Sequence, residues 1–186
     1  MRDTDRRVKY TKMVLRESLL ELLQDKPINR ISVTELCQNA DVNRGTFYAH
    51  YSEPYDLLKQ IEDELFEDIR RCFEEKPDNT MEETNMDLLL VINRNRELCR
   101  IILSDSASPN FMSRVYDVGA EYFRRYWKGS LERLDMPEDY LYRYIVTGNV
   151  ELIRYWIMND DNRSPEDIAA MMSSLVNRIM QAYRQK

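Results

Sequence analysis

Residues 31–51 read ISVTELCQNADVNRGTFYAHY, and this stretch predicts two short helices joined by a tight turn. Ser32 and Glu35 have the spacing of a capping box at the start of the first helix. After the turn, Asn43 can cap a second helix that begins at Arg44. Two short helices joined in this way form the helix-turn-helix pattern, whose second helix enters the DNA major groove.

The two sides of the second helix differ in chemistry. Val42 and Phe47 are apolar and are expected to face inward, where they lock the two helices together. Gly45 leaves the N-terminal end open, so a phosphate or a base edge could approach the free N–H groups and the positive pole of the helix dipole. The side chains expected to face outward are those of Arg44, Thr46, Tyr48 and His50.

His50 is the only histidine of the chain, which limits what it could do as a reactive group. A metal site built on it would need other ligands, and the sequence points to neither a nucleophile nor an orienting acid beside it. We therefore expect no enzyme, no catalytic residue, no metal and no cofactor. Tyr48 fits a phosphate contact, because aromatic hydroxyls are regular donors to phosphate.

Helical patterns continue through the rest of the chain, which predicts an all-α fold. One face of the first helix carries Leu15, Leu19, Leu22 and Leu23. A fourth helix is expected to begin near Pro54 and to end near Glu75. Later helices are expected at Met81–Asn93, Arg96–Leu103, Asn110–Leu134, Met136–Met158 and Pro165–Arg184. The predicted organisation is a three-helix helix-turn-helix domain at residues 1–53 and a C-terminal helical bundle at residues 54–186.

Charge is distributed unevenly along the chain. Residues 1–52 contain nine Lys/Arg and seven Asp/Glu, whereas residues 53–186 contain eighteen Lys/Arg and twenty-six Asp/Glu. This asymmetry favours a small module for an anionic partner attached to an acidic body.

Nothing in the sequence indicates export or insertion into a membrane. The apolar run LLLVI at Leu88–Ile92 is far shorter than the ~18 residues of a membrane helix, and the N-terminal residues have no apolar segment. Cys37, Cys72 and Cys99 lack the close spacing of a zinc or disulfide framework, which fits reduced thiols. We therefore expect a cytoplasmic protein.

The C-terminal half carries long apolar and aromatic faces. The last two predicted helices are apolar enough to face either the core of their own chain or a second chain. Eleven of the nineteen aromatic residues fall between Phe111 and Trp156, and such clusters suit a ligand pocket or an ordinary core. As a pocket, they would hold a small-molecule effector against Tyr116, Phe123, Tyr126, Trp127, Tyr144 and Trp156.

The stretch ISVTELCQNADVNRGTFYAHYSEPYDLL resembles the DNA-binding module of the tetracycline-repressor-like (TetR/AcrR) family of bacterial transcription regulators. The segments TGNVELIRYWIMND and SPEDIAAMM resemble a C-terminal domain that some members have. The resemblance implies a two-domain helical homodimer that binds double-stranded DNA at a palindromic operator. It also implies a ligand or partner that acts through the C-terminal domain.

The resemblance also implies roles for individual residues. Tyr51 takes a position that is usually a buried aromatic. The positions expected to face DNA, mostly its phosphates, are Thr34, Asn43, Arg44, Gly45, Thr46, Tyr48 and His50. The last two helices are expected to pair with their copies in a four-helix dimer interface, which would include Ile153, Ile157, Met171, Leu175 and Ile179.

Three positions depart from the family pattern. Asp41 stands where members commonly have glycine; aspartate tolerates a left-handed backbone but adds a negative charge near DNA. Ser52 and Pro54 stand where members often carry lysines. Phosphate affinity is then either lower than usual or supplied by the N-terminal cations Arg2, Arg6, Arg7, Lys9 and Lys12.

The sequence therefore predicts a dimeric DNA-binding transcription regulator of the repressor type, released by an effector of unknown identity. The alternative is a helical adaptor that binds protein partners and has lost DNA recognition, which Asp41, Pro54 and the acidic total favour. Retention on heparin at low salt distinguishes the two.

Overall fold

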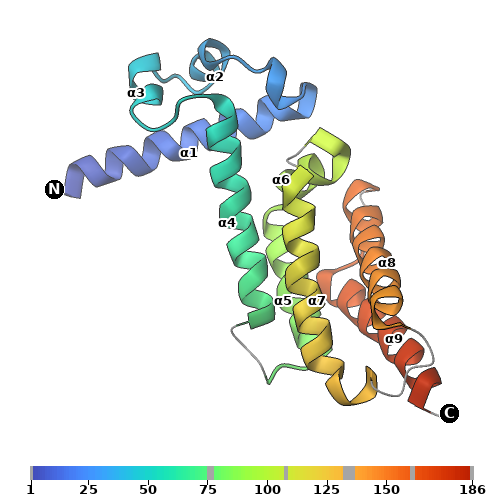
Figure 1. Cartoon of the computed structure of the whole chain (residues 1–186). Coiled ribbons are helices and arrows are strands. Elements are labelled where there is room, and N and C mark those ends of the chain that lie inside the picture. Colours follow the sequence, from blue (N-terminus) through green and yellow to red (C-terminus); the bar gives the residue numbers. More distant parts are fainter. Residues whose placement is uncertain (1, 75–77, 107–108, 132–136, 160–161, 185–186) are drawn as a thin grey trace. The chain divides into compact units, whose positions relative to one another are not determined.

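The computed structural model describes residues 2–74, 78–106, 109–131, 137–159 and 162–184, and every regular element in these ranges is a helix (Figure 1). The fold is all-α, as the sequence predicts. The N-terminal elements are α1 (Arg2–Asp25), a 3₁₀ turn (Ile28–Arg30), α2 (Val33–Asn39), α3 (Arg44–Tyr48) and α4 (Pro54–Glu74). They are followed by α5 (Met81–Arg94), α6 (Arg96–Ile101), a π-helical turn (Ile102–Ser106), α7 (Pro109–Leu131), α8 (Glu138–Met158) and α9 (Pro165–Arg184).

The helices form two compact units. Unit 1 comprises residues 1–64 and 101–108, and unit 2 comprises residues 65–100 and 109–186. The division falls within α4, whereas the sequence predicts a boundary at the start of this helix, between residues 53 and 54.

Unit 1 is built on the apolar face of α1. Leu15, Leu19 and Leu23 are buried on this face, at the helical spacing that the sequence shows. The hydroxyl of Ser18 donates to the backbone carbonyl of Leu36 at 3.3 Å, which ties α1 to α2 inside the core. These contacts fix the two helices that support α3.

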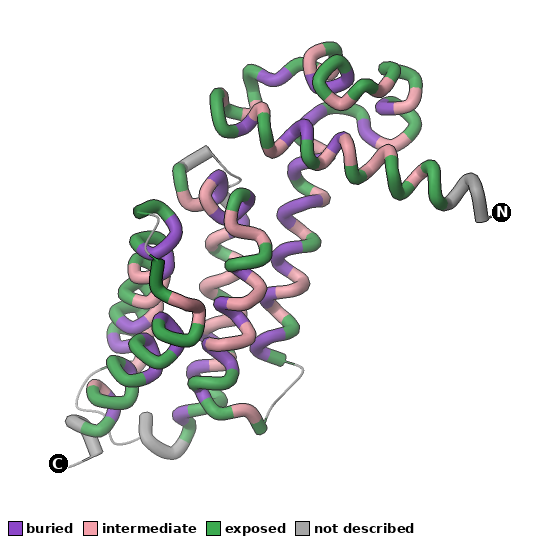
Figure 2. The backbone as a smooth tube through the Cα atoms, turned by 180° about the vertical axis from the view of Figure 1, so that it is seen from behind, coloured by how far each residue is buried: buried purple, intermediate pink, exposed green. Residues whose placement is uncertain are grey.

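Unit 2 is a bundle in which α5 and α9 make the most extensive contact. Asn85 of α5 and Ser173 of α9 are both buried, and the Asn85 amide donates to the Ser173 hydroxyl at 2.9 Å. Figure 2 shows buried positions recurring along the helices of this unit. One core cluster joins α5, α7, α8 and α9 through Met81, Phe123, Trp127, Leu141, Ile145, Val176 and Met180.

Side-chain caps explain several of the helix starts. At α9, the Ser164 hydroxyl accepts from the N–H of Asp167 at 3.2 Å, and the Asp167 carboxylate accepts from the N–H of Ser164 at 3.1 Å. At α5, Thr80 and Glu83 form a capping box that the sequence analysis did not predict. At α8, Pro137 occupies the N-cap position and supplies no side-chain cap.

The capping box predicted for α2 forms only by half. The Ser32 hydroxyl accepts from the N–H of Glu35 at 3.2 Å, but the Glu35 carboxylate pairs with the Lys26 ammonium instead of reaching back. The hydrogen bond from Lys26 is the main reason why the pKa of Glu35 is lowered. Lys26, which follows α1, thus takes the Glu35 carboxylate that would otherwise bind the backbone N–H of Ser32.

A helix is present where one was predicted, at Arg96–Leu103, but its last part is not α-helical. The α-helix ends at Ile101, and Ile102–Ser106 continues as a π-helical turn. The hydroxyl of Ser104 donates to the carbonyl of Ile101 at 2.9 Å, so this side chain takes a backbone acceptor at the junction.

The three cysteines are free thiols, all buried. Among the helices in the described ranges, none is both long and apolar enough to cross a membrane.

Candidate nucleic-acid interface

Phe47 anchors α3 to the rest of unit 1. Its side chain is completely buried, and its ring meets those of Tyr48 and Tyr51, each with centroids 5.7 Å apart. Val42, the other residue predicted to face inward, is half-buried and donates its N–H to the carbonyl of Cys37 at 2.9 Å. The buried ring therefore holds α3 through its inner side and leaves the other side open.

The turn between α2 and α3 depends on Asp41. This residue has a φ of +51°, the only positive φ among the non-glycine residues that the structure describes. Aspartate is one of the few residues with a side chain that adopt this left-handed conformation at low cost. The prediction for Asp41 is confirmed, and its exposed carboxylate adds a negative charge beside α3.

Asn43 caps α3 as predicted. Its side-chain oxygen accepts from the N–H of Thr46 at 2.8 Å and from the hydroxyl of Thr46 at 3.0 Å. A Cβ atom added at Gly45 would lie 3.3 Å from the same oxygen, so a larger residue there would press on the cap. Asn43, Gly45 and Thr46 therefore set the geometry at the start of the helix.

The residues predicted to face DNA differ in exposure. Tyr48 is 59% exposed, and Thr34, Asn43, Arg44 and Gly45 are also exposed. Thr46 and His50 are half-buried, because Thr46 belongs to the cap and the ring of His50 lies 6.3 Å from that of Tyr51. The side of α3 left open by Phe47 thus carries a guanidinium, a phenol and small polar groups.

Two neighbouring side chains support this surface from inside. The guanidinium of Arg44 lies close enough to Cys37 to oppose the rise in the pKa of this thiol that burial causes. Tyr51 is buried, as predicted for its position, and its hydroxyl donates to Gln60 of α4 at 3.1 Å. Burial is the main cause of the raised pKa of Tyr51, with a smaller contribution from the carboxylate of Glu64.

The start of α4 is capped by an acid. The Asp56 carboxylate accepts from the N–H groups of Ser52 and Glu53 at 2.9 and 3.3 Å. This role was not predicted from the sequence, although an aspartate in the first turn of a helix is a signal for it. The carboxylate of Asp56 therefore binds backbone N–H groups of the segment in which members of the resembling family often carry lysines.

The six aromatic residues predicted to line a ligand pocket do not gather around one space. Phe123 and Trp127 pack in the core cluster of unit 2, whereas Tyr144 is exposed on α8. Trp156 is buried elsewhere, under the guanidinium of Arg96 at 4.9 Å. Tyr116 is half-buried and Tyr126 is exposed.

A separate groove of about 590 Å³ lies between the N-terminal turns of α5 and α9. None of the predicted aromatic residues lines it. Its acidic residues are Glu82, Glu83, Asp87 and Glu166. In the parts of the chain that the structure describes, no group of three or more His, Cys, Asp or Glu residues could hold a metal ion.

The residues predicted for a dimer interface fall into two sets. Ile153 and Ile157 of α8 are buried within the single chain. Met171 and Leu175 of α9 are exposed, and Ile179 is half-buried. Of the five residues, only Met171, Leu175 and Ile179 of α9 have side-chain surface that a second chain could contact.

Comparisons with known proteins agree on one class of protein. A family model of the TetR type, described as the transcriptional regulator C-terminal region, matches residues 79–178. YxbF of Bacillus subtilis (strain 168), an uncharacterized HTH-type transcriptional regulator, is 23% identical over an alignment of 176 residues that covers 88% of this chain. The chain spans only 44% of the length of that relative.

Two solved structures extend this likeness over both units. A TetR transcriptional regulator from Streptococcus agalactiae 2603V is 26% identical, with a TM-score of 0.65 and coverage of 93% of this chain and 97% of that one. A transcriptional regulator of the AcrR type from Aquifex aeolicus VF5 is 23% identical, with a TM-score of 0.65 and coverage of 91% and 99%. At 23% identity, the similarity to the Aquifex aeolicus protein shows a shared fold and nothing more.

Proposed function

The chain belongs to the TetR family of transcriptional regulators, and we propose that it represses transcription by binding a palindromic operator as a homodimer. The observation that carries this proposal is the open side of α3, where Arg44 and Tyr48 are exposed above a completely buried Phe47. A short helix held only through its inner side can enter a major groove without losing its own packing.

The exposed residues of α3 have different roles in this proposal. Arg44 is the charged residue that can contact a base edge or a phosphate, and two hydrogen bonds from a guanidinium suit guanine. Tyr48 donates its hydroxyl to a phosphate, as does the exposed Thr34 at the second position of α2. Gly45 adds no side chain at the end of α3 that the DNA backbone would approach, and it leaves the Asn43 cap undisturbed.

A dimer is proposed because one α3 helix reads only one half-site. Two copies must present their α3 helices about 34–36 Å apart, or a multiple of that, to meet successive major grooves. Met171 and Leu175 are large apolar side chains exposed on one face of α9, four residues apart. A second copy of the chain would remove them from water.

Release from DNA is proposed to follow from an effector that binds unit 2. Phe123 and Trp127 are packed in the core cluster, so an effector beside them requires a second state of unit 2 in which these side chains separate. An effector that prefers this state, while DNA prefers the packed state, lowers operator affinity. A compound that changes tryptophan emission and at the same concentration releases DNA would support this step.

The experiment that tests the proposed function is selection of bound sequences from random duplex DNA. A palindromic site should be enriched, Arg44→Ala should cost about 1–3 kcal/mol if it reads a base, and Tyr48→Phe should weaken binding to all duplexes alike. The matched control is Lys128→Gln, which removes an exposed charge from α7 of unit 2. Absence of any enrichment, with no binding to heparin at low salt, would instead favour the protein adaptor.

A further inference from the structure

The positive charge of unit 1 is concentrated at the start of α1. The first twelve residues contain five Lys/Arg and two Asp, whereas residues 13–52 contain four Lys/Arg and five Asp/Glu. Within residues 31–51, which include α2 and α3, Arg44 is the only Lys or Arg. Affinity for a duplex depends on the number of phosphates that cations neutralise, so the helix-turn-helix stretch alone offers little of it.

One face of α1 lies against α2. The Ser18 hydroxyl donates to a backbone carbonyl of α2 at 3.3 Å, and the Glu21 carboxylate accepts from a side-chain amide of α2 at 2.9 Å. An α-helix repeats every 3.6 residues, so Arg7 and Tyr10 stand about three turns before these residues on the same face. This face therefore continues from α2 toward the N-terminus.

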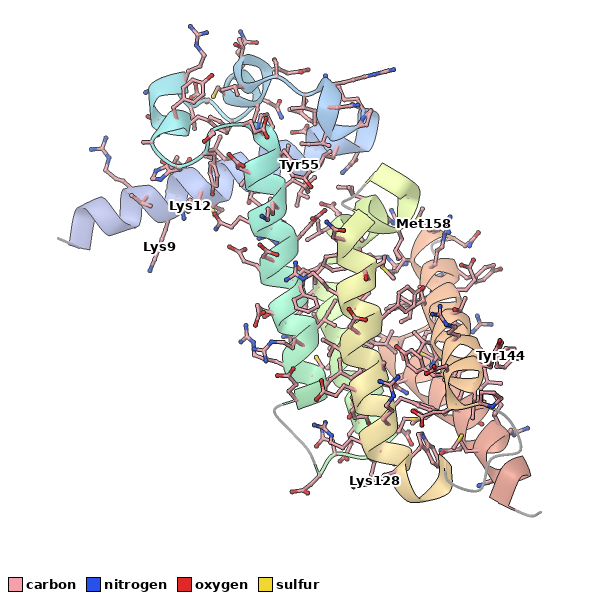
Figure 3. All side chains as sticks on the ribbon, in the orientation of Figure 1. Lys9, Lys12, Tyr55, Lys128, Tyr144 and Met158 are labelled. Carbon is pink, nitrogen blue, oxygen red and sulfur yellow. The ribbon has the colours of Figure 1, made fainter. Side chains whose placement is uncertain are left out.

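Another face of α1 belongs to α4. The guanidinium of Arg16 pairs with the Glu64 carboxylate of α4 at 2.7 Å. Lys12 and Lys9 precede Arg16 by about one and two turns and share its face. Figure 3 labels both lysines on α1. The cations at the start of α1 thus divide between a face continuous with α2 and a face continuous with α4.

The first face is open to an anionic partner. Arg7 is exposed, and Tyr10 is 63% exposed, so a guanidinium and a phenol hydroxyl are both accessible on this face. Arg7 stands about 17 Å along the helix axis from Ser18. In Figures 1 and 2 the first turns of α1 project beyond the other elements of unit 1.

We propose that the first turns of α1 form a second DNA-contact surface, in which Arg7 and Tyr10 bind operator phosphates that flank the segment read by α3. α3 follows α2 directly, so DNA that meets α3 is approached by the α2 face of α1 rather than by the α4 face. The contacts add affinity without sequence preference, because guanidinium and phenol groups donate to any phosphate. The proposal rests on the proposed function, since it requires DNA as the partner of α3.

The test compares two single variants of one helix with equal loss of charge. Arg7→Gln removes a cation from the α2 face, and Lys12→Gln removes a cation from the α4 face. Affinity for a selected operator is measured by fluorescence anisotropy as a function of salt, with unfolding curves to verify the fold. Each lost phosphate contact reduces the slope of log K against log salt by about 0.9, so Arg7→Gln, which removes one contact from each protomer of a dimer, should lower it by up to about 1.8.

The expected result is a loss of roughly tenfold at low salt for Arg7→Gln, equal on operator and random duplex, and a much smaller loss for Lys12→Gln. Tyr10→Phe should reduce affinity in the same sequence-independent way. Equal losses in the two variants would overturn the proposal, because they would reflect net charge and not contact. An unchanged slope for Arg7→Gln would also overturn it and leave the proposed function intact, whereas failure of the wild type to bind any duplex would remove both.

Discussion

The left-handed turn at Asp41 gives a prediction in which backbone strain and charge can be separated. A residue with a Cβ atom pays about 1–2 kcal/mol in this conformation, and short polar side chains reduce that cost. With φ at +51°, Asp41→Ala should destabilise the protein by about 1 kcal/mol. Asp41→Asn should leave stability unchanged, because asparagine tolerates the same conformation.

Asp41→Gly sets two effects against each other. Glycine removes the strain of the left-handed conformation, but it raises the entropy of the unfolded chain by an equivalent of about 0.4–1 kcal/mol. Stability should therefore stay within about 0.5 kcal/mol of the wild type. We therefore expect the proteins with glycine, aspartate or asparagine at position 41 to be about equally stable. The alanine variant should be less stable, and a valine variant should be the least stable.

The assay is urea denaturation followed by far-ultraviolet circular dichroism and by tryptophan fluorescence. Trp127 and Trp156 both belong to unit 2, so fluorescence reports on unit 2, while circular dichroism reports on all helices. If the units unfold separately, the Asp41 variants should shift only the transition seen by circular dichroism. Alanine as stable as the wild type, or glycine less stable than alanine, would refute the reasoning about the turn.

Three further predictions concern unit 2. Leu175→Glu should abolish the dimer in light scattering and leave helicity intact, because Leu175 is 46% exposed in the single chain; global unfolding would contradict this. Burial raises the pKa of the Cys99 thiol to about 12, so iodoacetamide at pH 8 should label Cys99 only after unfolding, and rapid labelling of the folded protein would refute this. Arg96→Gln should cost about 2 kcal/mol in urea denaturation, because the guanidinium donates to the Trp156 carbonyl at 2.9 Å and lies over its ring; unchanged stability would contradict this.

Helix positions could be predicted from the sequence because their signals are local. Asn43 and Ser164 cap helices through atoms within three residues, and the leucines of α1 repeat at the helical period. Phe47 could likewise be assigned to the core from its place between polar neighbours. Such features depend on the nearest turn of chain and not on the arrangement of helices.

Features that depend on distant residues were not accessible in this way. Glu35 satisfies the pattern of a capping box, but the sequence does not show that Lys26 takes its carboxylate. The aromatic residues of α7 and α8 have similar sequence surroundings, yet Trp127 joins the core cluster and Trp156 stacks under Arg96. Periodicity gives the faces of a helix but not the neighbour that each face meets.

The most direct test of DNA binding by α3 is photocrosslinking from single positions of the full chain to the selected operator. A photoreactive phenylalanine analogue replaces Tyr48 in one protein and Tyr140 in another; the two side chains are 59% and 73% exposed. Crosslinks from position 48 to bases or backbone within each half-site, and none from position 140 on α8, are the predicted result. Crosslinks from neither position, or equally from both, on an operator that the protein demonstrably binds would contradict the central claim.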